Sequence, residues 1–129
     1  NLMSLTDAQI WLGSAYQFMG LNTRSDVLES GRDTAVKLVR ALIKANQWVL
    51  ASPGSKVVAA APPEIVSGGH VQLLANAIDK YKKDLYPADG KLDVNAVQRV
   101  IDVQQTSGAL QTSSPFDAAD LFTNSLIPG

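Results

Sequence analysis

The chain has no cysteine and a single histidine, His70, among its 129 residues, and this shortage excludes several kinds of chemistry. Without cysteine there is no disulfide framework and no thiolate nucleophile. A zinc site takes several nitrogen or sulfur ligands, and one histidine does not supply them. We therefore interpret His70 as a solvent-facing residue at the start of a helix and predict no metal site.

Concentrated positive charge is also lacking, since the formal net charge is −1. Binding to nucleic acid requires a basic patch, so we predict no nucleic-acid partner. Lys80, Lys82 and Lys83 form a small basic run, but Asp79 and Asp84 flank it. This alternation of charge is typical of a solvated helix face.

The motifs that mark common catalytic and ligand sites are missing as well. The Ser-Gly-Gly at 67–69 is not followed by Gly-Lys-Ser/Thr, and no serine stands in a Gly-x-Ser-x-Gly elbow. Asp79, Asp84, Asp89 and Asp93 do not follow the spacing of a calcium-binding loop, so helix capping and solvation explain them better. We predict a non-enzymatic protein without a cofactor.

Long apolar runs are absent, since none approaches the ~20 residues that span a bilayer. The start, Asn1-Leu2-Met3, has neither the charged beginning nor the apolar segment of a signal peptide. We expect a chain that is cytosolic, already processed, or cut from something longer.

What the sequence does contain is a helical pattern in which 46% of the residues are hydrophobic. Apolar residues recur at spacings of three and four in the segments 32–51, 71–85 and 94–106, which predicts three clear helices. The stripe of the first is Ala35, Leu38, Val39, Leu42, Ala45 and Val49, and that of the second is Leu74, Ala77, Ile78, Tyr81 and Leu85. The stripe of the third is Val94, Val97, Val100, Ile101 and Val103, with Asp93 as its cap and Ser107-Gly108 as its stop.

Shorter elements lie between and around these helices. Brief helices are predicted near residues 6–12, 25–29, 55–61, 63–66 and 116–124. Residues 14–23 are aromatic, apolar and poor in charge, which predicts one strand. The fold class is therefore mainly α, with one or two short strands near 14–23.

Polar groups gather at and just beyond the predicted strand, and they are the candidate ligand-binding residues. They are Tyr16, Asn22, Thr23 and Arg24. In α/β proteins ligands are held just past strand ends, and Arg24 suits an anion by forked hydrogen bonds. The alternative is structural: Thr23 or Ser25 caps the next helix and Arg24 is merely exposed.

Several segments, taken in order, resemble one family of transport proteins. They include Thr23-Arg24-Ser25-Asp26-Val27-Leu28-Glu29 and 37–49, then 59–64, 77–82, 97–110 and 116–126. Together they resemble the carboxyl-terminal part of the solute-binding proteins of nitrate, sulfonate and taurine ABC importers. Those proteins are similar in fold to the thiamine-pyrimidine-synthesis proteins.

This resemblance implies a non-catalytic extracytoplasmic or periplasmic receptor. It would close two lobes over a small, anionic or sulfonate-like solute and deliver it to a membrane permease. Members of the family are about twice this length or more. The resemblance therefore implies that residues 1–129 are one helical unit, a carboxyl-terminal fragment of a larger two-lobed α/β protein.

Two other classes stay open, a free-standing helical protein-interaction module and an enzyme of the thiamine-pyrimidine type. The enzyme would require histidine-rich and cysteine-bearing chemistry, which this chain lacks. We also expect the isolated chain to form a homo-oligomer through the wide apolar arc of 32–51 and the edge of the strand. Burying ~600 Å² of apolar surface per chain would supply about 15 kcal/mol before association costs.

Overall fold

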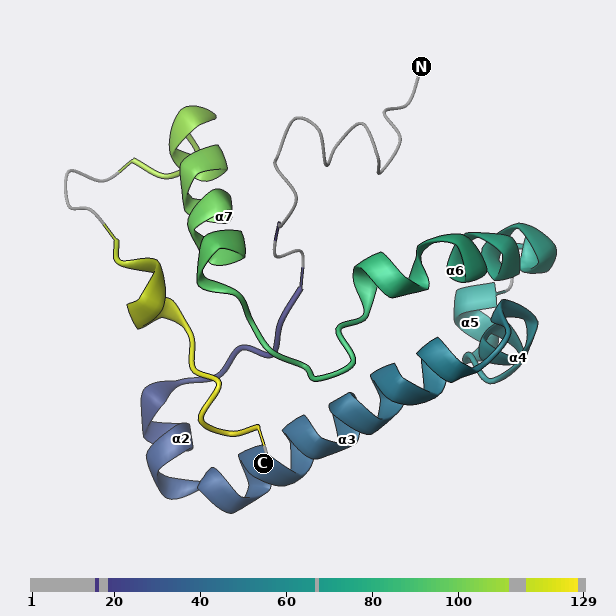
Figure 1. Cartoon of the computed structure of the whole chain (residues 1–129), viewed down its shortest axis with the longest axis horizontal. Coiled ribbons are helices and arrows are strands. Elements are labelled where there is room, and N and C mark those ends of the chain that lie inside the picture. The colour runs from purple at the N-terminus through teal and green to yellow at the C-terminus, as the bar shows by residue number, and fades with distance from the viewer. Residues whose placement is uncertain (1–15, 17–18, 67, 112–115, 128–129) are drawn as a thin grey trace. The chain divides into compact units, whose positions relative to one another are not determined.

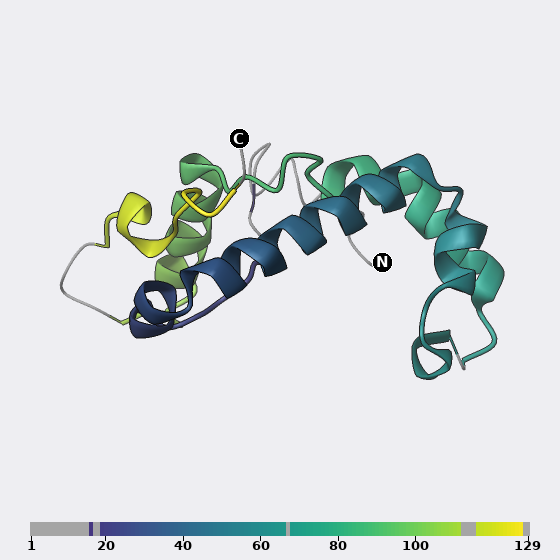
Figure 2. The same cartoon turned by 90° about the horizontal axis from the view of Figure 1, so that it is seen from below.

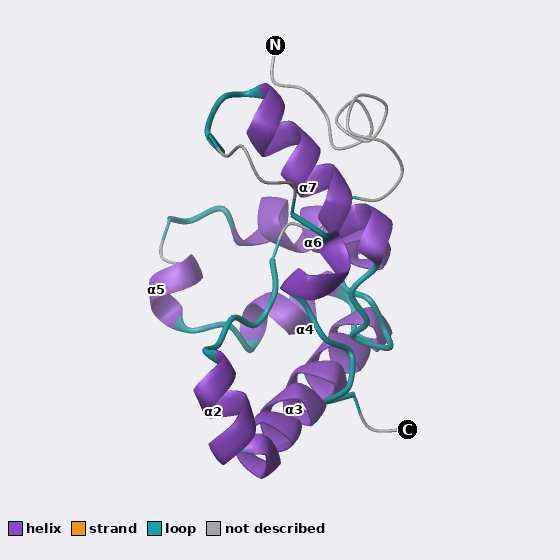
Figure 3. Ribbon diagram, turned by 90° about the vertical axis from the view of Figure 1, so that its left-hand side faces the viewer, coloured by secondary structure: helices purple, strands orange, loops and turns teal. Residues whose placement is uncertain are grey.

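A computed structural model describes residue 16 and the ranges 19–66, 68–111 and 116–127. The regular structure within these ranges is helical, and they contain no strand (Figure 3). The fold class is therefore mainly α, as the sequence predicts. Among the same residues, no helix is both long and apolar enough to cross a membrane.

The chain divides into two compact units, and the second is inserted into the first (Figure 1). One unit comprises Asn1–Ser30 and Lys91–Leu126, and the other comprises Gly31–Gly90 and Ile127–Gly129. The inserted unit holds helices α3 to α6. The other unit holds the short helix α2 (Ser25–Ser30), the helix α7 and a 3₁₀ turn, η1.

The longest helix is α3 (Arg32–Ala51), which runs uninterrupted until the Ser52-Pro53-Gly54 stop (Figure 2). Its bounds match the prediction, and the face that it buries matches in part. The half-buried positions of α3 are Ala35, Val36, Val39, Ile43, Asn46, Val49 and Leu50, of which Ala35, Val39 and Val49 belong to the predicted stripe. Leu38 and Leu42, which the sequence places in the buried stripe, are 49% and 44% exposed. The predicted stripe is therefore half right, and the packed face also includes Val36, Ile43, Asn46 and Leu50. Apolar spacing passes over Asn46 because its side chain is polar.

The helix α6 (Val71–Leu85) packs chiefly against α4 (Gly54–Ala59), with a smaller contact to α3. Leu74, Ala77, Ile78 and Tyr81 are half-buried, as the sequence predicts. The most buried position of α6 is Ala75, outside the predicted stripe, whereas Leu85 is exposed. Ala75 is the position of α6 whose backbone carbonyl lies directly against the start of α4 at Gly54.

Two glycines mark the places where the inserted unit is tightest. A Cβ on Gly54 would overlap with the carbonyl oxygen of Ala75, so α4 begins directly against the backbone of α6. Gly90 has a φ of +69°, and a Cβ there would lie 2.6 Å from Cγ1 of Ile43. Asp-Gly is a pair typical of such a turn, and glycine is needed here both for the positive φ and for the close approach.

The turn that ends at Gly90 is also tied to α3 by two side-chain amides. Asn46 Nδ2 donates to the carbonyl oxygen of Pro87 at 3.1 Å, and Gln47 Nε2 donates to that of Ala88 at 3.2 Å. Backbone carbonyls of a turn have no ladder partner, so these amides satisfy them. The polar Asn46 on the packed face of α3 is thereby explained.

In the other unit, α7 (Val94–Thr106) begins at Asp93, which caps it as predicted. The carboxylate accepts hydrogen bonds from the amides of Asn95 and Ala96, two of the donors left free at a helix start. The helix ends at Ser107, and Gly108 follows with a φ of +74°. Glycine adopts this conformation without strain, which is why the predicted stop is confirmed.

The terminal segment lies beside α7 through η1 (Ala118–Leu121), which Asp117 caps (Figure 1). The helical turn predicted for 116–124 is thus present but shorter. Asn124 holds this segment to the residue before the cap of α7. Its Oδ1 accepts from the amide of Leu92 at 3.0 Å, and its Nδ2 donates to the carbonyl of Leu92 at 2.9 Å.

The strand predicted for 14–23 is not found in residue 16 or residues 19–23, the part of that span that the structure describes. A strand needs a neighbour to pair its amides and carbonyls, and the described ranges offer none. Residues 14, 15, 17 and 18 lie outside the described residues, as does the short helix predicted for 6–12. The brief helices predicted at 25–29, 55–61 and 63–66 correspond to α2, α4 and α5 (Pro63–Val66).

Candidate functional site

The four predicted ligand-binding residues lie in the segment that leads into α2. Tyr16 is half-buried, whereas Asn22, Thr23 and Arg24 are exposed. The guanidinium of Arg24 already has a carboxylate partner within the chain. Its Nε and Nη2 donate to the two carboxylate oxygens of Asp26 at 3.0 and 2.9 Å.

This forked pair is the geometry that the sequence assigns to an anionic ligand, so Asp26 occupies that role in the structure. Both partners are well exposed, at 82% and 63% of their side chains. An exposed pair is weak and exchanges readily with water or another anion. The carbonyl of Arg24 also accepts the amides of Val27 and Leu28, so its backbone starts α2.

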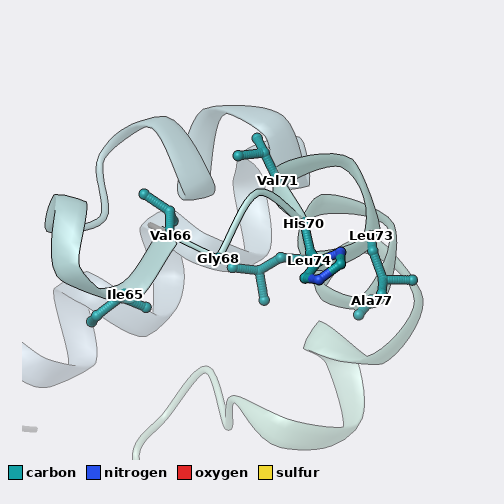
Figure 4. Close-up of a pocket in the computed structure, with 8 residues that line it drawn as sticks. All are labelled: Ile65, Val66, Gly68, His70, Val71, Leu73, Leu74 and Ala77. Atoms are coloured by element: carbon teal, nitrogen blue, oxygen red, sulfur yellow. The ribbon is translucent and has the colours of Figure 1, made fainter.

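A shallow apolar hollow of about 400 Å³ lies in the inserted unit, between α5 and the start of α6 (Figure 4). Figure 4 shows Ile65 and Val66 on α5, and the other lining residues on the loop and the first turns of α6. Those other residues are Gly68, His70, Val71, Leu73, Leu74 and Ala77. Ile65 and Leu73 are each 68% exposed, so the lining remains accessible to solvent.

The lining of this hollow is almost entirely apolar. Apart from His70, its side chains are apolar or absent, and ligand pockets of this size combine an apolar lining with few polar groups. His70 is exposed at the start of α6, as the sequence predicts, and its side chain makes no capping hydrogen bond. One imidazole without a second titratable group in the lining does not make an acid–base pair.

The charged side chains that tie α6 to its neighbours lie at the corner between α3 and α4. Asp79 Oδ1 accepts the amide of Gly54 at 2.9 Å and the ammonium of Lys82 at 3.0 Å. Lys82 Nζ also donates to the carbonyl of Ser52 at 2.8 Å. Ser52 itself is buried, and the side chain of Lys82 is only 14% exposed.

These donors explain the electrostatics of the carboxylate. The hydrogen bond from Lys82, and next the one from the Gly54 amide, hold the pKa of Asp79 below its ordinary value of 3.8. Partial desolvation opposes this effect without reversing it. The charged carboxylate of Asp79 therefore accepts hydrogen bonds from both the Gly54 amide and the Lys82 ammonium.

Sequence reasoning missed both this corner and the hollow. Lys82 was interpreted as part of a solvated face, which is wrong, since it lies four residues after Ile78 on the packed side of α6. That i, i+4 spacing is the signal that would have found it. Residues of the hollow were missed because Val71 and Leu73 fall outside the main stripe of α6, and Ile65 stands on a single turn.

Within the residues that the structure describes, no three histidine, cysteine or acidic side chains gather as a metal site would require. Comparison with known proteins adds no relative: no family model, no curated protein and no solved structure matches this chain.

Proposed function

We propose that this chain is part of an extracytoplasmic solute-binding protein of an ABC importer, with a small anionic or sulfonate-like solute as its ligand. The observation that carries the proposal is the ordered resemblance of residues 14–126 to the nitrate, sulfonate and taurine family. The helices α3, α6 and α7 lie where those resembling segments stand in the sequence. In this proposal the protein is periplasmic, acts without catalysis and hands its solute to a membrane permease.

A second feature that supports this proposal is the outward apolar surface of α3. Leu38 and Leu42 follow each other by four residues on one face and are each more than 40% exposed. Trp48, one turn and a half further on, is exposed to a similar extent. An apolar face of this kind suits a helix that packs against further protein, as the helices of a two-lobed receptor do.

The test is a thermal shift of the protein that contains this chain, in a panel of nitrate, sulfonates, taurine and aromatic acids. A ligand at one hundred times its Kd stabilises the folded state by about 2.7 kcal/mol, which a melting curve resolves. Arg24→Gln should reduce the shift, because the anion would lose its forked donor. Arg40→Gln, an exposed arginine on α3, is the matched control and should leave the shift unchanged. A flat response across the panel would count against the proposal.

We propose that the isolated chain also self-associates through the exposed apolar face of α3. The strand that the sequence offered for pairing is not found in the described residues, so the apolar side chains of Leu38 and Leu42 carry this part of the proposal. Light scattering at micromolar concentration should show a dimer that Leu38→Glu with Leu42→Glu dissolves. Arg40→Glu on the opposite side of α3 is the control, and a monomeric wild-type chain would refute self-association.

The same exposed face favours the second candidate, a free-standing helical interaction module. The two candidates differ in what precedes Asn1 in the gene. A reading frame that starts at Met3 would favour the module, whereas two upstream α/β lobes and a signal peptide would favour the receptor.

A further inference from the structure

We propose that Asp79 and Lys82 form a latch that holds α4 against α6 and thereby positions α5, which follows α4 in the chain, and that the apolar hollow keeps its shape only while this latch is closed. The latch consists of the Asp79 carboxylate, the Lys82 ammonium, the Ser52 carbonyl and the Gly54 amide. This inference is independent of the solute-binding proposal, since it concerns how the inserted unit holds its own surface.

The first step is that the α4–α6 contact at this corner is made by small side chains, so polar bonds contribute to fixing its geometry. Gly54 has no side chain, and its contact with α6 is backbone against backbone at Ala75. Of the residues in α4, only Gly54 and Val58 are buried, so the apolar contact is small. The bonds of Asp79 and Lys82 are charge-assisted, and the side chain of Lys82 is only 14% exposed, so they contribute to the geometry of the corner although the side chain of Asp79 is 48% exposed.

The second step is that the connection from α4 to α5 is short and internally bonded. The amides of Ala60 and Ala61 donate back to α4, to the carbonyls of Val57 and Val58 among others. Pro62 and Pro63 follow at once, and each proline ring fixes its φ. The amide of Ile65 then donates to the carbonyl of Pro62. A displacement of α4 therefore carries α5 with it.

The third step is that α5 supplies one wall of the hollow. Ile65 and Val66 come from α5, and the facing wall, including Leu74 and Ala77, comes from α6 (Figure 4). The distance between the two walls is thus set by the same contact that the latch closes. Release of the latch should widen the hollow and loosen the α5 wall.

Within the part of the chain that the structure describes, the charged side chain bonded to Asp79 is that of Lys82. The sole charged residue of α4 is Lys56, which is exposed. The last charged residue of α3 is Lys44, about two turns before the helix ends. On α6 itself, Lys80 lies with its ammonium 4.9 Å from the ring centre of Tyr81, and Lys83 and Asp84 are exposed.

The test uses the absence of native cysteine, which allows two spin labels to be attached at chosen sites of the full chain. One label goes on Ala60→Cys, between α4 and α5, and the other on Asn76→Cys, on the exposed side of α6. Pulsed electron paramagnetic resonance then gives the distribution of distances between the two spin labels. In the otherwise wild-type chain, where the latch is closed, the distance distribution should be narrow. The substitution Asp79→Asn or Lys82→Met should broaden this distribution and shift it to longer distances.

Amide exchange provides a second readout in the unlabelled protein. The amide of Gly54 should exchange about tenfold faster, or more, in Asp79→Asn, because it loses its charged acceptor. The amide of Ile65 should follow it, while amides of α7 in the other unit keep their protection. Exchange that rises equally everywhere would mean global destabilisation and would overturn the latch.

Asp84→Asn and Lys83→Met are the matched controls, since they remove the same charges from the exposed side of α6. Both should keep the narrow distribution and the slow exchange of Gly54. Should Asp79→Asn fail to fold, as judged by circular dichroism, Lys82→Met decides the question alone, because it preserves the carboxylate and the apolar stem. An unchanged distance distribution in a folded Lys82→Met would overturn the proposal.

Discussion

The contact of α4 with α6 and the contact of α7 with η1 are both built on small buried side chains, but different groups fix them in place. In the first, Gly54 and Ala75 meet at the backbone, and a charged pair holds the corner. In the second, Ala96 and Ala118 are buried, and a neutral amide on Asn124 joins the terminal segment to Leu92.

The difference teaches how a chain with a modest buried core holds its helices together. Small side chains permit close approach but contribute little apolar area, so directional polar bonds must fix the geometry. A charged pair is strong where it is partly desolvated and depends on pH. A primary amide stays neutral at every ordinary pH and matches one donor and one acceptor at once.

The largest loss of stability is expected from Gly54→Ala. In an open helix this change is favourable by about 0.5–1 kcal/mol, but here the added Cβ overlaps with a backbone carbonyl that has no rotamer to move to. We expect destabilisation toward the upper end of the about 1–3 kcal/mol that overpacking costs. Urea unfolding followed by circular dichroism measures it. Gly20→Ala, where nothing lies within 4 Å of the added Cβ, is the control.

Asn124→Ala should have the next largest effect, because it removes two hydrogen bonds at once. The amide and carbonyl of Leu92 are left in a partly buried place without their partner, which costs about 1–3 kcal/mol. Amide exchange at Leu92 should accelerate while exchange at Gly54 stays slow. The control is Gln111→Ala, which removes an exposed amide with one long hydrogen bond of 3.4 Å. It should change neither the stability of the protein nor the amide exchange at Leu92. Equal effects of the two substitutions would show that the amide clamp is unimportant.

Asp93→Ala should destabilise α7 by about 0.5–2 kcal/mol, since the amides of Asn95 and Ala96 lose their acceptor. The loss is local, so exchange should rise in the first turn of α7 and little elsewhere. Asp84→Ala, an exposed aspartate near the other end of a helix, provides the comparison. The cap hypothesis fails if both variants unfold at the same urea concentration.

The pH dependence of the α4–α6 contact is the smallest effect and the most specific one. Because the pKa of Asp79 is lowered in the folded protein, its contribution is fully present above the unfolded value of 3.8 and is lost as the pH falls below it. Wild type and Asp79→Asn should therefore differ in Tm at neutral pH and converge in acid. A difference that persists unchanged below the folded pKa would show that another group is responsible.

Most of the helical architecture could be predicted because it depends on local signals. Periodicity placed α3, α6 and α7, and Asp93 and Gly108 marked the two ends of α7, which the structure confirms. The packed face of α3 was predicted only in part, since the place of Asn46 on it depends on a bond to a turn 41 residues later. A strand likewise requires a partner, and the composition of residues 14–23 contains no information about one.

The charged corner and the hollow depend on tertiary contacts that a sequence pattern does not specify. Nothing local shows that the amide of Gly54 lies 25 residues from its acceptor, or that Lys82 extends to Ser52. Arg24 is the converse case. Its forked geometry was predicted, but its partner Asp26 stands only two residues away. The ligand-binding role of Tyr16, Asn22, Thr23 and Arg24 stays a prediction.

The side-chain amide of Asn124 accepts a hydrogen bond from the backbone amide of Leu92 and donates one to its carbonyl oxygen. These are the two bonds that a residue of a neighbouring strand would form with Leu92. Two positions that touch each other are therefore under opposite constraints. At 124 only a short side chain with both a donor and an acceptor serves, so aspartate, with no donor when ionised, would fail. The side chain of residue 92 takes no part in these two hydrogen bonds, which use only its backbone. Proline is therefore the one amino acid that they exclude at this position, because it has no amide hydrogen.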